Sequence, residues 1–314
     1  MNQSRKMTDG ALLLAIFMVI LLVTIFVPVL SVFSMFFLPV PFVLFASRHG
    51  FKPSLVMFAV SLVLATMFAT FFSLPLALLM GLGGITVGSA IYKEYSPYET
   101  WARGTFGFVI GLLFVFVSSQ MIFSVNWVDE LEVMVTDSLE MSSSLMESFG
   151  VAEQSEEFEA LIQLQVQTMI DLLPVGLALS ALVLAFLSQW ISYKFINRLE
   201  KKELRFSPFR NLRFPPSILW IYFFALIFSF ISRDPSSFFF TAVQNVLVLT
   251  GLIMTMQGFS FIFYYAYHKK ISKSIPIFIV ILTILFPTFL LYFIRILGII
   301  DIGFRLRDHL ENKK

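Results

Sequence analysis

Nine apolar stretches recur along this chain of 314 residues, and they constrain its fold more than any other feature. A helix of about 20 residues crosses the roughly 30 Å hydrocarbon core of a bilayer. With 58% hydrophobic and only 13% charged residues, the chain lacks the polar surface that a soluble domain needs around its core. In lipid, a helix satisfies its own backbone hydrogen bonds. The sequence therefore predicts an all-α, polytopic transmembrane helix bundle, with segments at residues 8–27, 29–46, 55–74, 76–92, 106–123, 169–193, 217–231, 238–267 and 277–297.

Two of these segments contain proline where a straight helix is disfavoured. Segment 29–46 carries Pro39 and Pro41, which predict a kink or a break. Pro287 lies in the middle of segment 277–297 and favours a kink or a re-entrant turn. Either eight or nine segments therefore cross the membrane.

Lys and Arg fall on alternate connections, which predicts the orientation of the chain. A cytoplasmic N-terminus places sixteen bases on the cytoplasmic side: Arg5, Lys6, Arg48, Lys52, Lys93, Arg103, Lys194, Arg198, Lys201, Lys202, Arg205, Arg210, Arg213, Lys269, Lys270 and Lys273. The connections on the other side hold one base, Arg233. If all nine segments crossed, the charged tail 299–314 would lie on that other side, against the rule.

The long connection at residues 126–168 is acidic. From Gly104 to Tyr193 the chain has no Lys or Arg, yet it holds more than half of its 20 acidic residues there. Apolar residues near helical spacing on both sides of Gly150 predict one long acidic extracytoplasmic helical hairpin. The hairpin is either a solvated cap, or a lid over an external substrate entrance or a cation-attracting surface.

The sequence contains none of the common catalytic motifs. There is no H-E-x-x-H, G-x-S-x-G, phosphate-binding G-x-x-x-x-G-K or dinucleotide fingerprint, and no calcium-loop spacing. The chain has three His and no Cys. We therefore expect no enzyme activity, no cofactor, no metal site and no nucleic-acid partner.

The polar residues expected in the membrane interior carry no charge. Arg295 and Asp301 are expected at the end of the last segment, where they do not lie at mid-membrane. Gln244, Asn245 and Gln257 share one long segment and form a candidate polar cavity. The alternative for each is an interhelical hydrogen bond within the bundle.

Small residues at helical spacing occur in two segments. Gly10, Ala11 and Ala15 form a candidate face for docking a partner protein, or else they pack within the bundle. Gly84 and Gly88 are candidates for close helix packing.

Four stretches together resemble one family of membrane proteins. They are "MTDGALLLAIFMVILLVTIFVPVLSVFSMFFLPVPFVLFASRHG", "YKEYSPYETWARGTFGF" after the Gly-rich fourth segment, "QGFSFIFYYAYHKK" and "LGIIDIGFRLR". Their order is similar to that of the YybS-like family of bacterial multi-spanning proteins. The resemblance implies a bacterial plasma membrane location but no particular chemistry.

The first six segments are similar in layout to the substrate-capture subunits of energy-coupling-factor transporters. In those subunits an A-x-x-x-A pattern on the first helix contacts the coupling subunit, and Ala11 and Ala15 match that pattern. The resemblance implies a six-helix membrane domain at residues 1–195, which includes the acidic connection 126–168. The capture subunits usually end after six helices, whereas this chain continues with a basic cytoplasmic linker at 196–214, further membrane helices at 215–298 and the charged tail at 299–314.

Two functions remain open from the sequence. In the first, the protein is a solute-capture component of a membrane transport system that works with a coupling partner. Its first six segments then hold a small solute near the outer face, and the acidic hairpin gates it. In the second, it is a membrane scaffold for envelope or signalling partners, which bind its basic linker. The sequence does not specify the oligomeric state.

Overall fold

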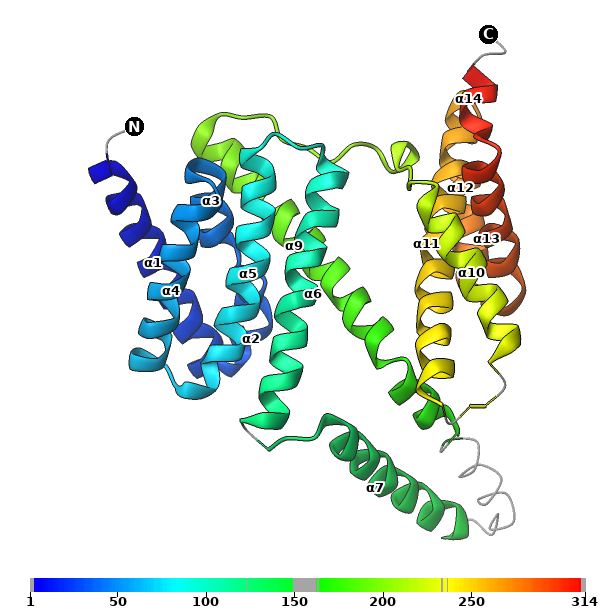
Figure 1. Ribbon diagram of the computed structural model, residues 1–314, viewed down its shortest axis with the longest axis horizontal. Helices are drawn as coiled ribbons and strands as arrows, with labels where there is room; N and C mark the ends of the chain where they lie inside the picture. Colours follow the sequence, from blue (N-terminus) through cyan, green and yellow to red (C-terminus); the bar gives the residue numbers. More distant parts are fainter. Residues whose placement is uncertain are drawn as a thin grey trace. The chain divides into compact units, whose positions relative to one another are not determined.

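A computed structural model describes residues 3–122, 124–148, 162, 164–232, 234–235 and 237–311 (Figure 1). All of the secondary structure in these residues is helical, which confirms the all-α prediction. Seven helices are long and apolar enough to cross a membrane: Gln3–Phe26, Pro28–His49, Phe51–Phe68, Phe71–Tyr92, Pro97–Met121, Leu173–Glu200 and Phe238–His268. Two of the predicted segments correspond to shorter apolar helices, at Ser217–Ile231 and Ser274–Leu285.

The chain divides into two compact units. The first comprises Met1–Ile170 and Gly176–Phe206, and the second comprises Asp171–Val175 and Ser207–Lys314. The division falls inside the predicted linker 196–214. Within this linker the structure extends a helix to Glu200, and the Asn197 side chain then exchanges two hydrogen bonds of 2.8 Å with the backbone of Leu204.

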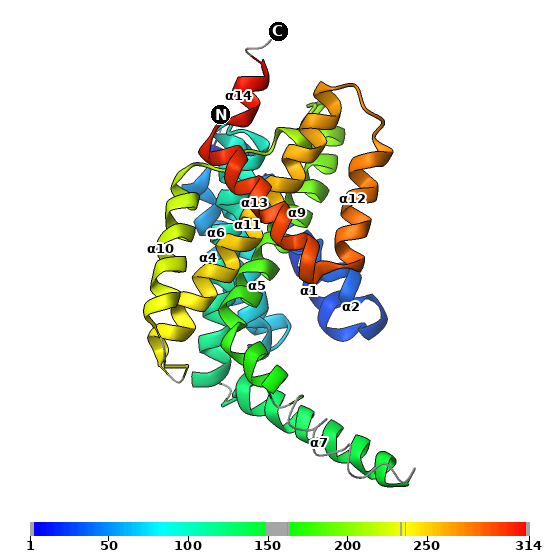
Figure 2. The same ribbon diagram turned by 90° about the vertical axis from the view of Figure 1, so that its right-hand side faces the viewer.

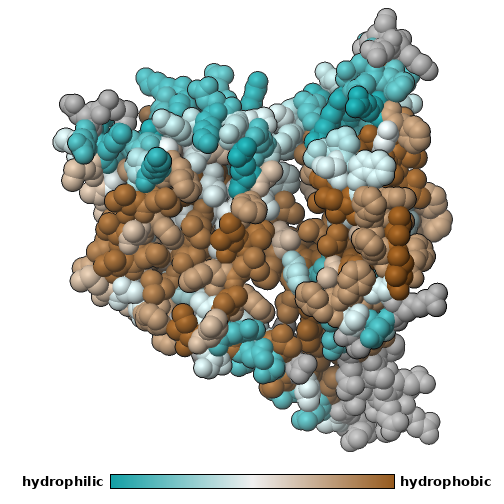
Figure 3. Space-filling model, in the orientation of Figure 1, coloured by the Kyte–Doolittle hydropathy of each residue, from teal (hydrophilic) through white to brown (hydrophobic). Residues whose placement is uncertain are grey.

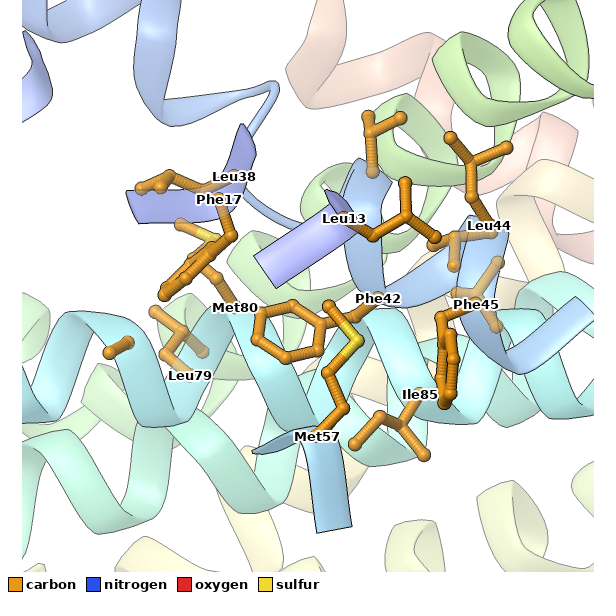
Figure 4. Packing of buried hydrophobic residues seen from close by; sticks show 14 of the residues in the cluster. Leu13, Phe17, Leu38, Phe42, Leu44, Phe45, Met57, Leu79, Met80 and Ile85 are labelled. Atoms are coloured by element: carbon orange, nitrogen blue, oxygen red, sulfur yellow. The ribbon is translucent and has the colours of Figure 1, made fainter. Parts of the chain in front are cut away.

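The first unit is built around its fifth helix. Its helices are α1 (Gln3–Phe26), α2 (Pro28–Met35), α3 (Val40–His49), α4 (Phe51–Phe68), α5 (Leu74–Tyr92), α6 (Pro97–Met121), α7 (Trp127–Ser148) and most of α9 (Leu173–Glu200), with the 3-10 turn η1 (Phe71–Ser73). Figure 4 shows Phe17 of α1, Phe42 of α3 and Met80 of α5 in one hydrophobic cluster. On the face drawn in Figure 3, this unit has a hydrophobic band between two hydrophilic ends.

Glycines set how closely α5 approaches its neighbours. A Cβ at Gly84 would lie 2.6 Å from the carbonyl oxygen of Pro39, and one at Gly88 would lie 2.5 Å from that of Val43. No side chain fits at either position without moving α3, since both neighbours are backbone atoms. The structure thus uses Gly84 and Gly88 for helix packing inside this unit.

The predicted break in the second segment is present. α2 ends at Met35, a turn follows, and α3 begins at Val40 with Pro39 as its N-cap. Pro41 lies in the first turn of α3, where its missing N–H would have no helical partner anyway.

The acidic connection begins as a single helix. The indole Nε1 of Trp127 donates a 2.6 Å hydrogen bond to Ser119 Oγ and fastens the start of α7 to α6. Asp129 and Glu130 occupy the first turn of α7, where carboxylates interact favourably with the helix dipole. The return arm of the predicted hairpin lies largely outside the described residues.

The second unit contains a helical hairpin that starts and ends at the same end of the unit. The elements of this unit are η2 (Phe209–Asn211), α10 (Ser217–Ile231), α11 (Phe238–His268), α12 (Ser274–Leu285), α13 (Pro287–Gly303) and α14 (Leu306–Glu311). The hairpin consists of α12 and α13. In Figures 1 and 2, α13 returns to the end at which α12 begins. The 12 residues of α12 extend about 18 Å at 1.5 Å per residue, which is less than a bilayer core of roughly 30 Å.

Pro287 separates the two arms, because it is the first residue of α13 and follows the non-helical Phe286. The tail then meets the basic segment: Arg307 Nη1 donates hydrogen bonds to the carbonyl oxygens of Arg210, at 2.7 Å, and Leu212, at 3.1 Å. The tail and residues 210–212 therefore lie at one end of the unit. α12 and α13 thus form the hairpin expected of a re-entrant segment, and the number of crossings, eight or nine, stays a prediction.

Candidate functional site

One cavity of the first unit lies where α5 ends and α6 begins. It has a volume of about 600 Å³, within the range of ordinary ligand pockets. Its wall consists of Phe51, Thr86, Ser89, Ala90, Lys93, Tyr95, Glu99, Ala102, Arg103 and Phe106. We refer to it as the α5–α6 cavity.

The local sequence explains the tight turn at the cavity mouth. The N–H of Tyr95 bonds to the carbonyl oxygen of Ala90, and that of Glu94 bonds to Ile91, so α5 ends in a Schellman motif. Glu94 takes the left-handed conformation that this motif requires, with φ of 55°. Ser96 then caps α6, because its hydroxyl accepts a 3.3 Å hydrogen bond from the N–H of Glu99.

The mouth of the cavity carries more positive than negative charge. Arg103 Nη2 lies 3.0 Å from Glu99 Oε1, and the Arg103 guanidinium lies 4.1 Å from the centre of the Tyr95 ring. Lys93 has no carboxylate within 4.0 Å among the described residues. One Lys, one Arg and one Glu leave a net charge of +1 beside the apolar walls.

Ser89 adds a polar group to the buried part of the cavity. Its side-chain oxygen is buried and has no hydrogen-bond partner in the described structure. A buried polar group without a partner costs about 1–3 kcal/mol. Ser89 therefore belongs to the cavity wall, with its hydroxyl beneath the accessible surface.

The small residues of α1 do not share one face. Gly10 points inward, where a Cβ would lie 3.3 Å from the Phe45 ring. Ala11 and Ala15 are exposed, together with Leu12 and Ile16. The two alanines are therefore exposed on α1, and their use as a docking face stays a prediction.

The three polar residues of α11 do not form one cavity. Asn245 binds the backbone of residues 171–175, donating to the Asp171 carbonyl oxygen at 2.6 Å and accepting from the Val175 N–H at 3.2 Å. Gln257 lies 12 positions further along, about 18 Å away on the helix, and accepts from the N–H of Phe214 at 3.1 Å. Gln244 is half-buried. Asn245 and Gln257 thus form hydrogen bonds between segments of the second unit, which is the alternative to a shared cavity.

A buried ion pair, which the sequence did not reveal, lies at the Gln257 end of α11. The side chains of Arg307 and Asp301 are each 2% exposed, and Arg307 Nη2 lies 2.9 Å from Asp301 Oδ2. Gln257 donates to the same carboxylate oxygen, and Arg307 also donates to Ser260 Oγ at 3.1 Å. Burial lowers the pKa of Arg307 and the Asp301 carboxylate opposes that effect, so the guanidinium stays charged.

A second basic residue lies deeper in the same unit. A Cβ at Gly251 would lie 3.0 Å from Cζ of Arg295, and Gly251 is close to the middle of α11. Arg295 Nε is buried without a hydrogen-bond partner in the described residues. The expectation of a neutral interior is therefore wrong, since Arg295 reaches the centre of an apolar helix. Ionisable residues at such depth are costly and often functional.

Comparison with known proteins identifies the family. Residues 15–302 match the sequence profile of DUF2232, which is described as "Predicted membrane protein". The chain belongs to this family. It is also 30% identical to "Uncharacterized protein YybS" of Bacillus subtilis (strain 168), over 99% of this chain and 100% of that protein. The DUF2232 match and the apolar helices together show a multi-pass integral membrane protein.

No solved structure matches this chain. The resemblance to the YybS-like family is confirmed by these matches. The comparisons do not extend to the capture subunits of energy-coupling-factor transporters, and that likeness stays a proposal.

Proposed function

We propose that this DUF2232 protein is a non-enzymatic solute-capture component of a membrane transport system. The α5–α6 cavity carries the proposal, because it combines a ligand-sized volume with a net charge of +1 among the residues that line it. Lys93 and Arg103 would hold an acidic group of the solute. Phe51 and Phe106 would contact its apolar part.

The distribution of bases supports an orientation for this proposal. Lys93 and Arg103 belong to the sixteen bases that the positive-inside rule assigns to the cytoplasm. The chain would then lie in a bacterial plasma membrane with its N-terminus in the cytoplasm. The α5–α6 cavity would open toward the cell interior, not toward the outer face that the sequence predicted for the solute. The described arm of the acidic connection, α7, follows the far end of α6 and does not line this cavity. A role as its lid is therefore not supported by the geometry.

Native mass spectrometry of the full-length protein in mild detergent tests the capture proposal. We expect a small acidic solute to remain bound to the wild-type protein. Lys93→Gln and Arg103→Gln should each lower its occupancy about tenfold, because a hydrogen bond to a charged group contributes about 1.5–3 kcal/mol. Lys52→Gln, at an exposed base in the first turn of α4 that does not line the cavity, is the control. A wild-type protein that carries no solute, and that associates only with envelope or signalling proteins, would instead support the scaffold function.

The exposed face of α1 supports the second part of the proposal, a coupling partner. Small side chains let two membrane helices approach closely, and Ala11 and Ala15 lie one turn apart on this face. Ala11→Leu with Ala15→Leu should abolish co-purification of an ATPase-linked membrane subunit. Membrane insertion and thermal stability should stay unchanged, because neither alanine is buried in the unit.

A matched variant separates docking from a general effect of added bulk. Val60→Leu with Val63→Leu enlarges two exposed positions of α4, and we expect it to leave association intact. Equal association of the wild type and the α1 variant would contradict docking through α1. A loss of insertion in the α1 variant would show that the alanines pack internally.

A further inference from the structure

The second unit contains a basic cavity that the proposed function does not use. It has a volume of about 330 Å³ and lies between η2, the end of α11 and the start of α12. Arg210, Lys270 and Lys273 line it together with Phe263, Ala266 and Pro276. We call it the α11–α12 cavity.

The three bases of this cavity have no carboxylate within 4.0 Å in the described structure. The acidic groups of the tail already have other partners. Asp308 lies 2.8 Å from Arg213, and Glu311 accepts a 2.7 Å hydrogen bond from Tyr264. The cavity therefore keeps a charge of +3 that its own unit does not neutralise.

The backbone and an aromatic ring hold these bases in place. The Arg210 guanidinium lies 3.8 Å from the centre of the Tyr267 ring, a distance that favours a cation–π interaction. α11 ends in a Schellman motif, in which the N–H of Ile271 bonds to Ala266 and that of Lys270 bonds to Tyr267. Lys270 accordingly has a φ of 55°. Lys273 is the N-cap of α12.

The rest of the cavity wall is apolar. Ala266 and Pro276 are buried, while Ile277 and Phe209 are partly exposed beside them. A ligand that fits both halves carries a compact anion joined to hydrocarbon. Basic pockets between membrane helices bind phospholipid head groups by the same combination.

We propose that the α11–α12 cavity binds the phosphate of an anionic phospholipid. The head-group phosphate contacts Arg210, Lys270 and Lys273, and an acyl chain lies against the apolar wall. This site is independent of the α5–α6 cavity and of solute capture.

Lys270→Gly gives a sharp test, because it removes a base from the cavity and also relieves backbone strain. Glycine adopts a positive φ without the steric cost that lysine has, so the variant should fold at least as stably as the wild type. The full-length protein is reconstituted in nanodiscs of equal phosphatidylglycerol and phosphatidylcholine, extracted into mild detergent and examined by native mass spectrometry. We expect the ratio of retained phosphatidylglycerol to phosphatidylcholine to fall about fivefold, as for one base near a membrane surface.

Four further variants complete the test. Lys273→Gln and Arg210→Gln should each lower the ratio to a similar degree. Lys201→Gly removes one exposed base and relieves the same backbone strain in the first unit, away from this cavity, and should leave the ratio unchanged. An unchanged ratio in the double variant Lys270→Gly with Lys273→Gln would overturn the proposal.

A soluble phosphate separates the lipid from a free anion. We expect sn-glycerol 3-phosphate at the same concentration as the lipid to leave phosphatidylglycerol bound, because it lacks the acyl chain. Displacement of the lipid by this compound would show a site for soluble phosphates and would overturn the lipid assignment.

Discussion

Arg307→Met should lower the free energy of unfolding by about 3–5 kcal/mol, the usual cost of breaking a buried ion pair from one side. The Asp301 carboxylate is 2% exposed and would keep only the amide of Gln257 as a described side-chain partner. The carbonyl oxygens of Arg210 and Leu212 would lose their hydrogen bonds to Arg307 as well. Unfolding followed by circular dichroism in mild detergent, with increasing sodium dodecyl sulfate, measures this loss.

Arg213→Met is the matched control for that variant. Arg213 also bridges the basic segment and the tail, through Asp308 at 2.8 Å, but its side chain is 47% exposed. Exposed ion pairs contribute at most about 1 kcal/mol. The double variant Arg307→Met with Asp301→Asn should be more stable than Arg307→Met, because no charge stays buried. A loss below about 1 kcal/mol in Arg307→Met would contradict a structural role for the buried pair.

The buried pair could not be predicted from the sequence, because a charged chain end such as 299–314 is expected to be exposed to solvent. Asp301 and Arg307 become buried only after Pro287 reverses the chain and α13 packs beside α11. The carbonyl partners of Arg307 lie more than 90 residues earlier. Arg295 was misplaced for a related reason, since the predicted segment ended at residue 297 whereas α13 continues to Gly303.

Local features were predictable where a residue type has one physical use. Pro39 and Pro287 marked the helix breaks, because proline cannot supply an interior helix N–H. Gly84 and Gly88 marked a close helix contact, which the structure places against α3. The orientation of Ala11 and Ala15 was not predictable, because alanine fits equally well against another helix and against lipid.

The α5–α6 cavity was not visible in the sequence. The predicted segment began at residue 106, whereas α6 begins at Pro97 after its N-cap Ser96. The cavity also needs Phe51, which is far from this turn in the chain and reaches the wall through the first turn of α4. Sequence spacing carries no signal for such a contact, so neither the cavity nor the free charge of Lys93 could be predicted.

The close contact of α11 and α13 leads to a second large expected effect. A Cβ at Gly298 would overlap the carbonyl oxygen of Met254 and would lie 2.8 Å from the backbone nitrogen of Gly258. Both neighbours are backbone atoms, so the helices must separate to admit even one methyl group. Gly298→Ala should therefore lower the free energy of unfolding by about 2–3 kcal/mol, the upper part of the usual range for overpacking. The same unfolding experiment in detergent measures it.

Gly303→Ala is the control in the same helix. Its Cβ would meet Leu219 Cδ1 at 3.5 Å, an ordinary van der Waals distance, and alanine is the better helix former. We expect no loss of stability there.

Separation of α13 from α11 would also draw Asp301 away from Gln257, so Gly298→Ala and Arg307→Met should affect the same element. Their combined cost should then be smaller than the sum of the two, since coupled sites are not additive. A fully additive pair would show that the glycine contact and the buried ion pair stabilise the second unit independently.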